Sequence, residues 1–148
     1  MIQLTLVNQS KTTMPRRFME GWVRAVEGRL RRRRTSFPKG AELTIVFLDR
    51  GAARRLNRDH RGRDYATDVL SFEGDGPFLG ELIICPSVVK RQAVEHDLSF
   101  RAELAYMILH GLLHLLGFDH ERNAKQARRM FALQDGIFEE LSRLHSPS

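Results

Sequence analysis

Cysteine is almost absent from this sequence, whose 148 residues contain only Cys85. A single thiol cannot form an internal disulfide, and small secreted scaffolds normally carry several paired cysteines, so a disulfide-stapled extracellular domain is excluded. The first residues, MIQLTLVNQS, also lack the basic leader and the apolar run of a signal peptide. We therefore expect a protein of the cytoplasm.

Long hydrophobic runs are absent as well. The most apolar stretch, residues 104–118, is shorter than the roughly 20 residues that a membrane-spanning helix needs, and it contains two histidines. Hydrophobic residues make up 42% of the chain, and we see no internal repeat and no linker between domains. We expect one domain over residues 1–148, with a frayed tail at residues 144–148, and no membrane partner.

Acidic residues are outnumbered by basic ones. Lys and Arg number 24 against 18 Asp and Glu, which gives a formal net charge of +6. This excess favours a polyanionic partner, because cations that neutralise phosphates release condensed counterions. The densest basic segment, residues 29–34, includes Arg32 and Arg33. It is typical either of the solvated C-terminal end of a helix or of a surface that contacts RNA, and both interpretations stay open here.

Hydrophobic periodicity predicts a mixture of strands and helices. The strand-like segments are residues 2–7, 43–48, 69–72 and 82–85. The helical segments are residues 13–33, a short stretch after Asp49, residues 86–94, a stretch that ends at Gly117, and residues 123–144, while the polar residues 57–67 suit a helix end and a loop. This order predicts an α+β domain in which a mixed, mostly four-stranded sheet is covered by helices. We expect the helix that ends at Gly117 to be central and buried, because it is apolar nearly all round.

The string HGLLHLLGFDH at residues 110–120 falls in this central helix. His110 and His114 are four residues apart, so on a helix both rings project from one face, near enough to bind one metal ion. Gly117 suits the left-handed conformation that reverses the chain, and such a reversal would bring His120 to the same ion. Three imidazoles and one open position are the layout of a catalytic zinc site, although nickel, copper or iron also suits these ligands.

The residues of this string also have structural interpretations. A histidine on an apolar face is more often a packed, hydrogen-bonded core residue than a ligand, but burial of both His110 and His114 among leucines is costly unless something satisfies them. Asp119 either orients a ligand through a hydrogen bond or caps the next turn. The spacing matches the zinc-protease string HExxHxxGxxH, but Gly111 stands where a protease needs a glutamate as general base. This difference argues against ordinary peptidase chemistry.

Two blocks of the sequence resemble the YbeY family of bacterial endoribonucleases that mature ribosomal RNA. They are LNRDHRGRDYATDVLSF at residues 56–72 and HGLLHLLGFDH at residues 110–120. Between them, LGELIICPSVVKRQA at residues 79–93 is similar to the family's connecting strand and helix. The resemblance implies that His110, His114 and His120 hold the metal ion, with Zn²⁺ as the cofactor.

The resemblance also assigns the charged residues of the first block. It implies that Arg61 is the catalytic arginine acting beside His114, because a guanidinium suits the charge that develops on a phosphoryl group. Arg63 would position a phosphate. Apart from the resemblance, the basic charge of the first helix suggests that Arg32 and Arg33 would hold the RNA backbone without reading bases. Two carboxylates are further candidates for the surroundings of the metal: Asp68, which lines the cleft or caps a turn, and Glu81, where the family frequently has aspartate.

The implied function is metal-dependent cleavage of single-stranded RNA. Its expected context is processing of the 3′ end of small-subunit ribosomal RNA and ribosome quality control, with the small ribosomal subunit and its proteins as partners. Two other functions stay open: a metal-dependent hydrolase of peptides or amides, which the protease-like histidine spacing favours, and a non-catalytic ribosome assembly factor in which the metal only braces the helix.

Overall fold

The computed structural model of the chain describes residues 1–61, 69–118 and 123–145, except for the side chains of residues 60, 61 and 145. The elements follow the order β1 (Gln3–Asn8), α1 (Arg16–Arg32), β2 (Glu42–Phe47), α2 (Arg50–Arg61), β3 (Val69–Glu73), β4 (Phe78–Ile84), α3 (Pro86–Glu95), α4 (Phe100–Leu115) and α5 (Ala124–His145). This order confirms the predicted α+β class.

The four strands form one mixed sheet with the order β1-β2-β4-β3. β1, β2 and β4 run parallel to one another, whereas β3 pairs with β4 in the antiparallel sense. The parallel pairs are joined by helical crossovers, and a short turn joins β3 to β4. Gly80 belongs to this hairpin, and a side chain there would bring its Cβ to 2.3 Å from the carbonyl oxygen of Phe72. The mixed four-stranded sheet expected from the sequence is confirmed.

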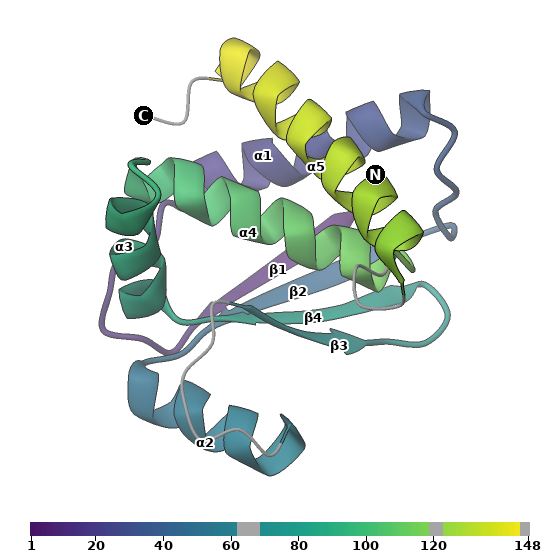
Figure 1. Cartoon of the computed structure of the whole chain (residues 1–148). Helices are drawn as coiled ribbons and strands as arrows, with labels where there is room; N and C mark the ends of the chain where they lie inside the picture. Colours follow the sequence, from purple (N-terminus) through teal and green to yellow (C-terminus); the bar gives the residue numbers. More distant parts are fainter. Residues whose placement is uncertain (62–68, 119–122, 146–148) are drawn as a thin grey trace.

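Helices cover both faces of the sheet. Figure 1 shows α1, α4 and α5 on one side and α2 on the other, with α3 standing beside the start of α4. The core between the sheet and the larger helical layer is formed by side chains that are at most 1% exposed, among them Trp22, Leu30, Leu43, Ile45, Leu82, Leu104 and Ile108. Burial of this apolar surface is the main favourable contribution to folding.

The central helix α4 has well-defined ends. The side chain of Ser99 accepts a hydrogen bond from the backbone N–H of Ala102 at 3.1 Å, which caps the first turn. At the other end the N–H groups of Gly117 and Phe118 donate to the carbonyl groups of His114 and Leu113, and Gly117 has a φ of 98°. This pair of bonds is a Schellman motif, which confirms that Gly117 ends the helix in the left-handed region.

No helix within the three described segments is both long enough and apolar enough to cross a membrane.

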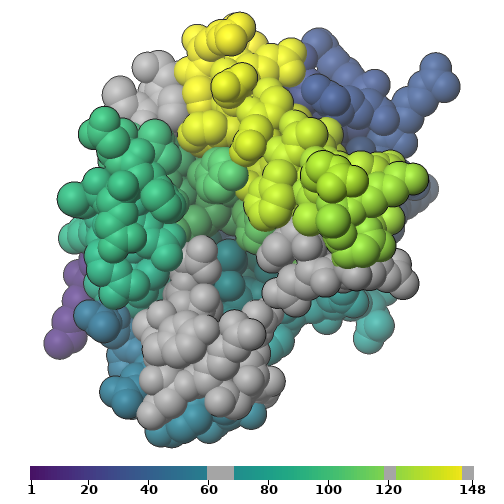
Figure 2. All heavy atoms as spheres, in the orientation of Figure 1, coloured from purple at the N-terminus to yellow at the C-terminus, as the bar shows by residue number. Residues whose placement is uncertain are grey.

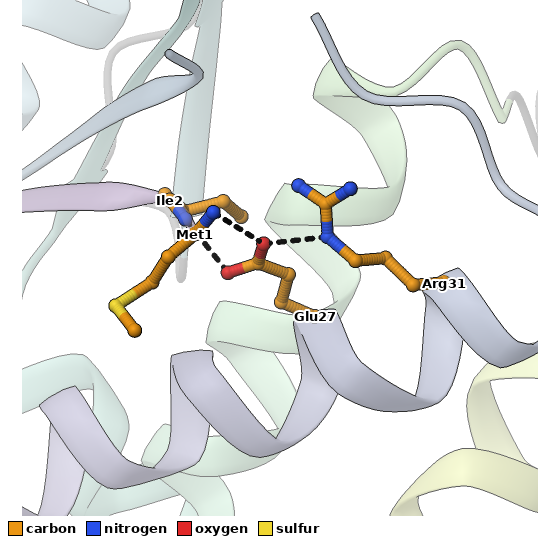
Figure 3. Close-up of polar contacts among 4 residues, drawn as sticks. All are labelled: Met1, Ile2, Glu27 and Arg31. Atoms are coloured by element: carbon orange, nitrogen blue, oxygen red, sulfur yellow. Dashed lines mark hydrogen bonds and ion pairs between the residues drawn. The ribbon is translucent and has the colours of Figure 1, made fainter. Parts of the chain in front are cut away.

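A buried carboxylate joins the start of the chain to α1 (Figure 3). Glu27 is 4% exposed, and its side chain accepts hydrogen bonds from the backbone N–H of Ile2 and from Nε of Arg31, both at 2.7 Å. The amino group of Met1 lies 3.5 Å from the same carboxylate. Burial alone would raise the pKa of Glu27, but these hydrogen bonds and positive charges outweigh it and lower the pKa from its ordinary value.

Candidate metal centre

His110 and His114 lie together on the face of α4 that the sequence predicted. Their ring centroids are 5.2 Å apart and both residues are partly buried. The i, i+4 spacing produces this proximity, because residues one turn apart on a helix project from the same face. α4 is otherwise buried on nearly every side, so the two imidazoles are polar groups held in an apolar helix. Two imidazoles that the sequence predicts to bind one metal ion therefore lie side by side.

Gln134 of α5 sets the tautomer of the first histidine. Its Oε1 lies 2.8 Å from Nδ1 of His110, and the residue is fully buried. An amide oxygen only accepts hydrogen bonds, so a neutral His110 carries its proton on Nδ1 and has an unprotonated Nε2. This is the form in which an imidazole coordinates a metal, and metal-ligating histidines usually donate their other N–H in this way. Sequence reasoning did not find Gln134.

The chemistry of these donors fits a divalent metal such as zinc, which takes imidazole nitrogens in a tetrahedral arrangement. His120, the third ligand predicted from the sequence, lies outside the described residues, as does its neighbour Asp119. Over the described segments, no group of three His, Cys, Asp or Glu side chains is placed to hold a metal ion. The structure thus brings two of the three predicted ligands side by side, and metal binding by all three stays a prediction.

Gly111 explains why a protease-like glutamate does not follow the first histidine. A Cβ atom at this position would lie 2.7 Å from Cδ2 of Leu82 in β4, closer than real side chains approach. Position 111 therefore faces the sheet, where α4 and β4 pack closely, and a carboxylate there would have to displace the buried Leu82 side chain. Any proton acceptor for a reaction at His110 and His114 must come from another part of the chain.

Ionisable groups border the histidine pair on α4. Glu103, one turn into α4, has a 2% exposed side chain, and its Oε1 lies 2.6 Å from Nδ1 of His96. The hydroxyl of Tyr106 donates to Oδ1 of Asp135 at 2.9 Å. Partial burial, together with this hydrogen bond to the Asp135 carboxylate, raises the pKa of Tyr106 and keeps its hydroxyl protonated.

The predicted RNA-binding arginines of α1 lie apart from the histidine pair. Arg32 ends α1, Arg33 caps it, and both are exposed. Their neighbour Arg29 contacts Glu140, whereas His110 contacts Phe131 and Gln134 earlier in α5. The basic end of α1 therefore meets a later part of α5 than the histidines do. Arg31 is already engaged, because it binds Glu27 and lies 4.6 Å from the centre of the Phe37 ring.

Glu81 lies on the opposite face of the sheet from α4. Its neighbour Leu82 points toward Gly111, and successive residues of a strand face opposite sides. The structure therefore does not bring Glu81 to the histidine pair. Three other predicted site residues cannot be placed beside the histidines: Arg63 and Asp68 lie outside the described residues, and Arg61 is described only as the last backbone position of α2.

Comparison with known proteins extends these local observations to the whole chain. Residues 5–142 match the family model described as "Endoribonuclease YbeY". A protein of that name from Bdellovibrio bacteriovorus is 48% identical over 143 residues, which cover 95% of each chain. Another of that name, from Geobacillus thermodenitrificans, is 45% identical over 114 residues, covering 68% of this chain and 72% of the relative.

The fold has a counterpart among solved structures. The solution structure of a protein from Thermotoga maritima superposes with a TM-score of 0.66 at 27% identity, covering 96% of this chain and 89% of that one. The likeness extends over nearly the full length in both sequence and fold. On this evidence the chain belongs to the endoribonuclease YbeY family.

Proposed function

We propose that this protein is a metal-dependent, single-strand-specific endoribonuclease that processes the 3′ end of small-subunit ribosomal RNA and takes part in ribosome quality control. The observation that carries the proposal is the His110–His114 pair, with its Nδ1-protonated tautomer fixed by Gln134, in a chain that matches endoribonucleases over 95% of its length. A metal ion held by this pair would supply the Lewis acid that cleavage of a phosphodiester bond uses.

The metal centre in this proposal holds one Zn²⁺ ion, with nickel or another divalent metal as the alternative. His110, His114 and His120 are its ligands, and Asp119 orients one of them. When bound, such an ion supplies positive charge that polarises a phosphodiester oxygen. Gln134 keeps the His110 ring in its coordinating tautomer, and the apolar packing of α4 holds both rings in place before substrate arrives.

Arg61 is the proposed catalytic arginine. Its guanidinium is always charged and offers a planar fork of donors, which suits the extra negative charge of a phosphoryl group in the transition state. Arg63 positions a neighbouring phosphate, Asp68 lines the cleft, and the exposed Arg32 and Arg33 attract the RNA backbone from a distance. Gly111 disfavours the peptide-hydrolase alternative, since it stands where that chemistry needs a glutamate base and a glutamate there would have to displace Leu82.

The enzyme class is tested with one labelled RNA in single-stranded and duplex form and with casein. We expect the zinc-loaded protein to cleave the single strand only. His114→Ala removes bound zinc and cleavage together, whereas Arg61→Ala keeps zinc and slows cleavage by at least about tenfold. Arg58→Ala removes an exposed arginine from the same helix and serves as the matched control. Degradation of casein without RNA cleavage would reject the proposal.

The cellular context is tested separately. In this proposal the protein acts as a single cytoplasmic domain, residues 1–148, on the small ribosomal subunit and its proteins. The purified protein should co-sediment with small subunits, and cells that lack it should accumulate small-subunit RNA with an extended 3′ end. Normal 3′ ends in such cells would separate the nuclease activity from ribosomal RNA maturation. Binding to small subunits that survives metal removal, with no cleavage at any zinc load, would favour a non-catalytic assembly factor.

A further inference from the structure

A cavity of about 190 Å³ is lined in part by His110, one of the predicted metal ligands. Residues of α4 contribute most of its described lining, and β3, α3 with its C-cap His96, and α5 contribute the rest. Figure 2 shows the hollow from outside, with α4 visible between α3 and α5. The cavity therefore opens beside the place where the proposed function puts the scissile phosphate.

The cavity presents one buried acceptor and one buried donor. Glu103 contributes a carboxylate whose Oε1 is bonded to His96. Gln134 uses its Oε1 for His110. Its amide partly offsets the rise in the pKa of Tyr106, but Nε2 makes no bond of full hydrogen-bond geometry among the described residues. A buried donor without a partner is costly, and a ligand that supplies an acceptor would remove that cost.

One wall of the cavity is aromatic. Phe131 is 39% exposed, and its ring stacks on the His110 ring with centroids 6.4 Å apart and planes 18° from parallel. Met107 adds apolar surface to the same cavity. A flat aromatic wall beside a donor and an acceptor suits a planar heterocycle, because every nucleobase has a π face and a hydrogen-bonding edge.

The charge of the cavity distinguishes a base from a phosphate. The Glu103 carboxylate would repel a phosphate, whereas it would accept a hydrogen bond from an amino group. Cytosine, adenine and guanine carry an exocyclic amino group. Uracil has no amino group. The single N–H that it can offer lies between two carbonyl groups, whose oxygens the Glu103 carboxylate would repel.

From these contacts we infer that the cavity is a base-binding subsite. It holds one nucleobase with an exocyclic amino group, with that group on Glu103, an acceptor of the base on Nε2 of Gln134, and the ring beside Phe131. The inference rests on the proposed function for its substrate and deepens it, because it assigns a base preference to an enzyme otherwise expected to hold only the RNA backbone. Glu103 and Phe131 are then residues that determine specificity.

Two measurements test this subsite. In the first, the zinc-loaded protein cleaves a pool of single-stranded RNA of mixed sequence, and the ends of the products are sequenced. We expect amino-bearing bases to exceed uracil about tenfold at one position beside the cut. In the second, the metal-free protein is titrated with cytidine, adenosine, guanosine and uridine, and binding is followed by NMR at the side-chain amide of Gln134. Uridine should bind least.

Variants of two residues define the contacts. Glu103→Gln places an amide in the cavity and should abolish or reverse the preference against uracil. Glu95→Gln makes the same charge change on the exposed face of α3 and should leave the base preference intact. Phe131→Ala should weaken nucleoside binding about tenfold, and it tests the site even if Glu103→Gln does not fold.

The two proposals can fail independently. Nucleoside binding without RNA cleavage would reject the nuclease function and keep the subsite. RNA cleavage without base preference, together with no nucleoside binding by the metal-free protein, would overturn the subsite and keep the nuclease function.

Discussion

At the scale of single residues, a hydrogen bond on one nitrogen of His110 decides what the other nitrogen can do. The amide oxygen of Gln134 holds the Nδ1 proton, so the coordinating Nε2 form is prepared before any metal binds. Gln134 comes from α5, whereas both histidines come from α4. Any metal affinity that His110 confers therefore depends on how α5 packs against α4.

Gln134→Leu should test this dependence. Leucine fills a similar space but offers no acceptor, so the Nδ1-protonated tautomer loses its advantage and zinc affinity should fall about 10- to 100-fold. Competition with a chromophoric chelator measures the affinity, and NMR of the ring nitrogens in the metal-free protein reports the tautomer. Gln134→Glu keeps an acceptor and should retain affinity to within a few-fold. Gln126→Leu is the matched control on the same helix. Unchanged affinity in Gln134→Leu would show that the hydrogen bond has no role in metal binding.

Glu27 illustrates how a buried charge makes stability depend on pH. Its pKa is lower in the folded protein than in the unfolded chain, so its ionised form stabilises the fold. That contribution is fully present above the unfolded pKa and is lost as the pH falls through the folded value. Glu27→Gln should therefore lower the free energy of unfolding by about 1 kcal/mol at pH 7, and the deficit should shrink below pH 4.5.

Urea unfolding of both proteins between pH 7 and pH 3 measures this effect. Glu20→Gln is the control, because its exposed ion pair with Arg16, at 3.5 Å, should contribute little. A constant difference between the wild type and Glu27→Gln at every pH would contradict the assigned pKa shift.

Residue-scale prediction from sequence succeeded where the partners are close in the chain. The histidine pair follows from the helical period alone, since positions 110 and 114 are one turn apart. Gln134 and Glu103 were not found, because no local pattern says that a glutamine 24 positions away will contact His110, or that a glutamate two turns earlier on α4 will line a cavity beside it. Such contacts arise only from tertiary packing.

At the scale of elements, the ends of helices were harder to predict than their existence. α1 begins at Arg16, after Pro15, rather than near residue 13, and α2 continues to Arg61 although polar residues from 57 onward suit a helix end and a loop. Arg58 and Asp59 lie on the exposed face of α2, and polar residues there do not interrupt its backbone hydrogen bonds, so composition alone placed the boundary too early. The end of α4 was predicted correctly because Gly117 has a specific conformational reason to be there.

Two glycine substitutions, which should change the stability of the protein in opposite directions, test this reasoning. Gly117→Ala places a side chain at a φ of 98°, which should destabilise the protein by about 1–2 kcal/mol. Gly28→Ala lies in the exposed interior of α1 with open space around its Cβ, and it should stabilise the protein by about 0.5–1 kcal/mol. Urea unfolding at pH 7 measures both. A Gly117→Ala variant as stable as the wild type would contradict the left-handed conformation assigned to Gly117, whatever the effect of Gly28→Ala.

At the scale of the whole molecule, the positive charge is only partly available to a partner. Two arginines of the basic segment at the end of α1 are engaged inside the protein, Arg29 with Glu140 and Arg31 with Glu27. Arg32 and Arg33 are exposed and form no ion pair within the described residues. Part of this segment therefore stabilises helix packing, and Arg32 and Arg33 stay exposed to solvent, so contact with RNA stays a prediction for these two residues.

The salt dependence of RNA binding should distinguish local contact from general attraction. If Arg32 and Arg33 each neutralise one phosphate, the double variant Arg32→Ala/Arg33→Ala should reduce the slope of log K against log salt concentration by about 1.4 for single-stranded RNA. Arg16→Ala/Arg17→Ala makes the same change in net charge at the other end of α1 and should leave the slope nearly unchanged. Fluorescence anisotropy of a labelled RNA between 50 and roughly 200 mM salt covers the range in which such contacts respond strongly. Equal losses of slope in the two variants would mean that net charge, rather than this end of α1, attracts the RNA.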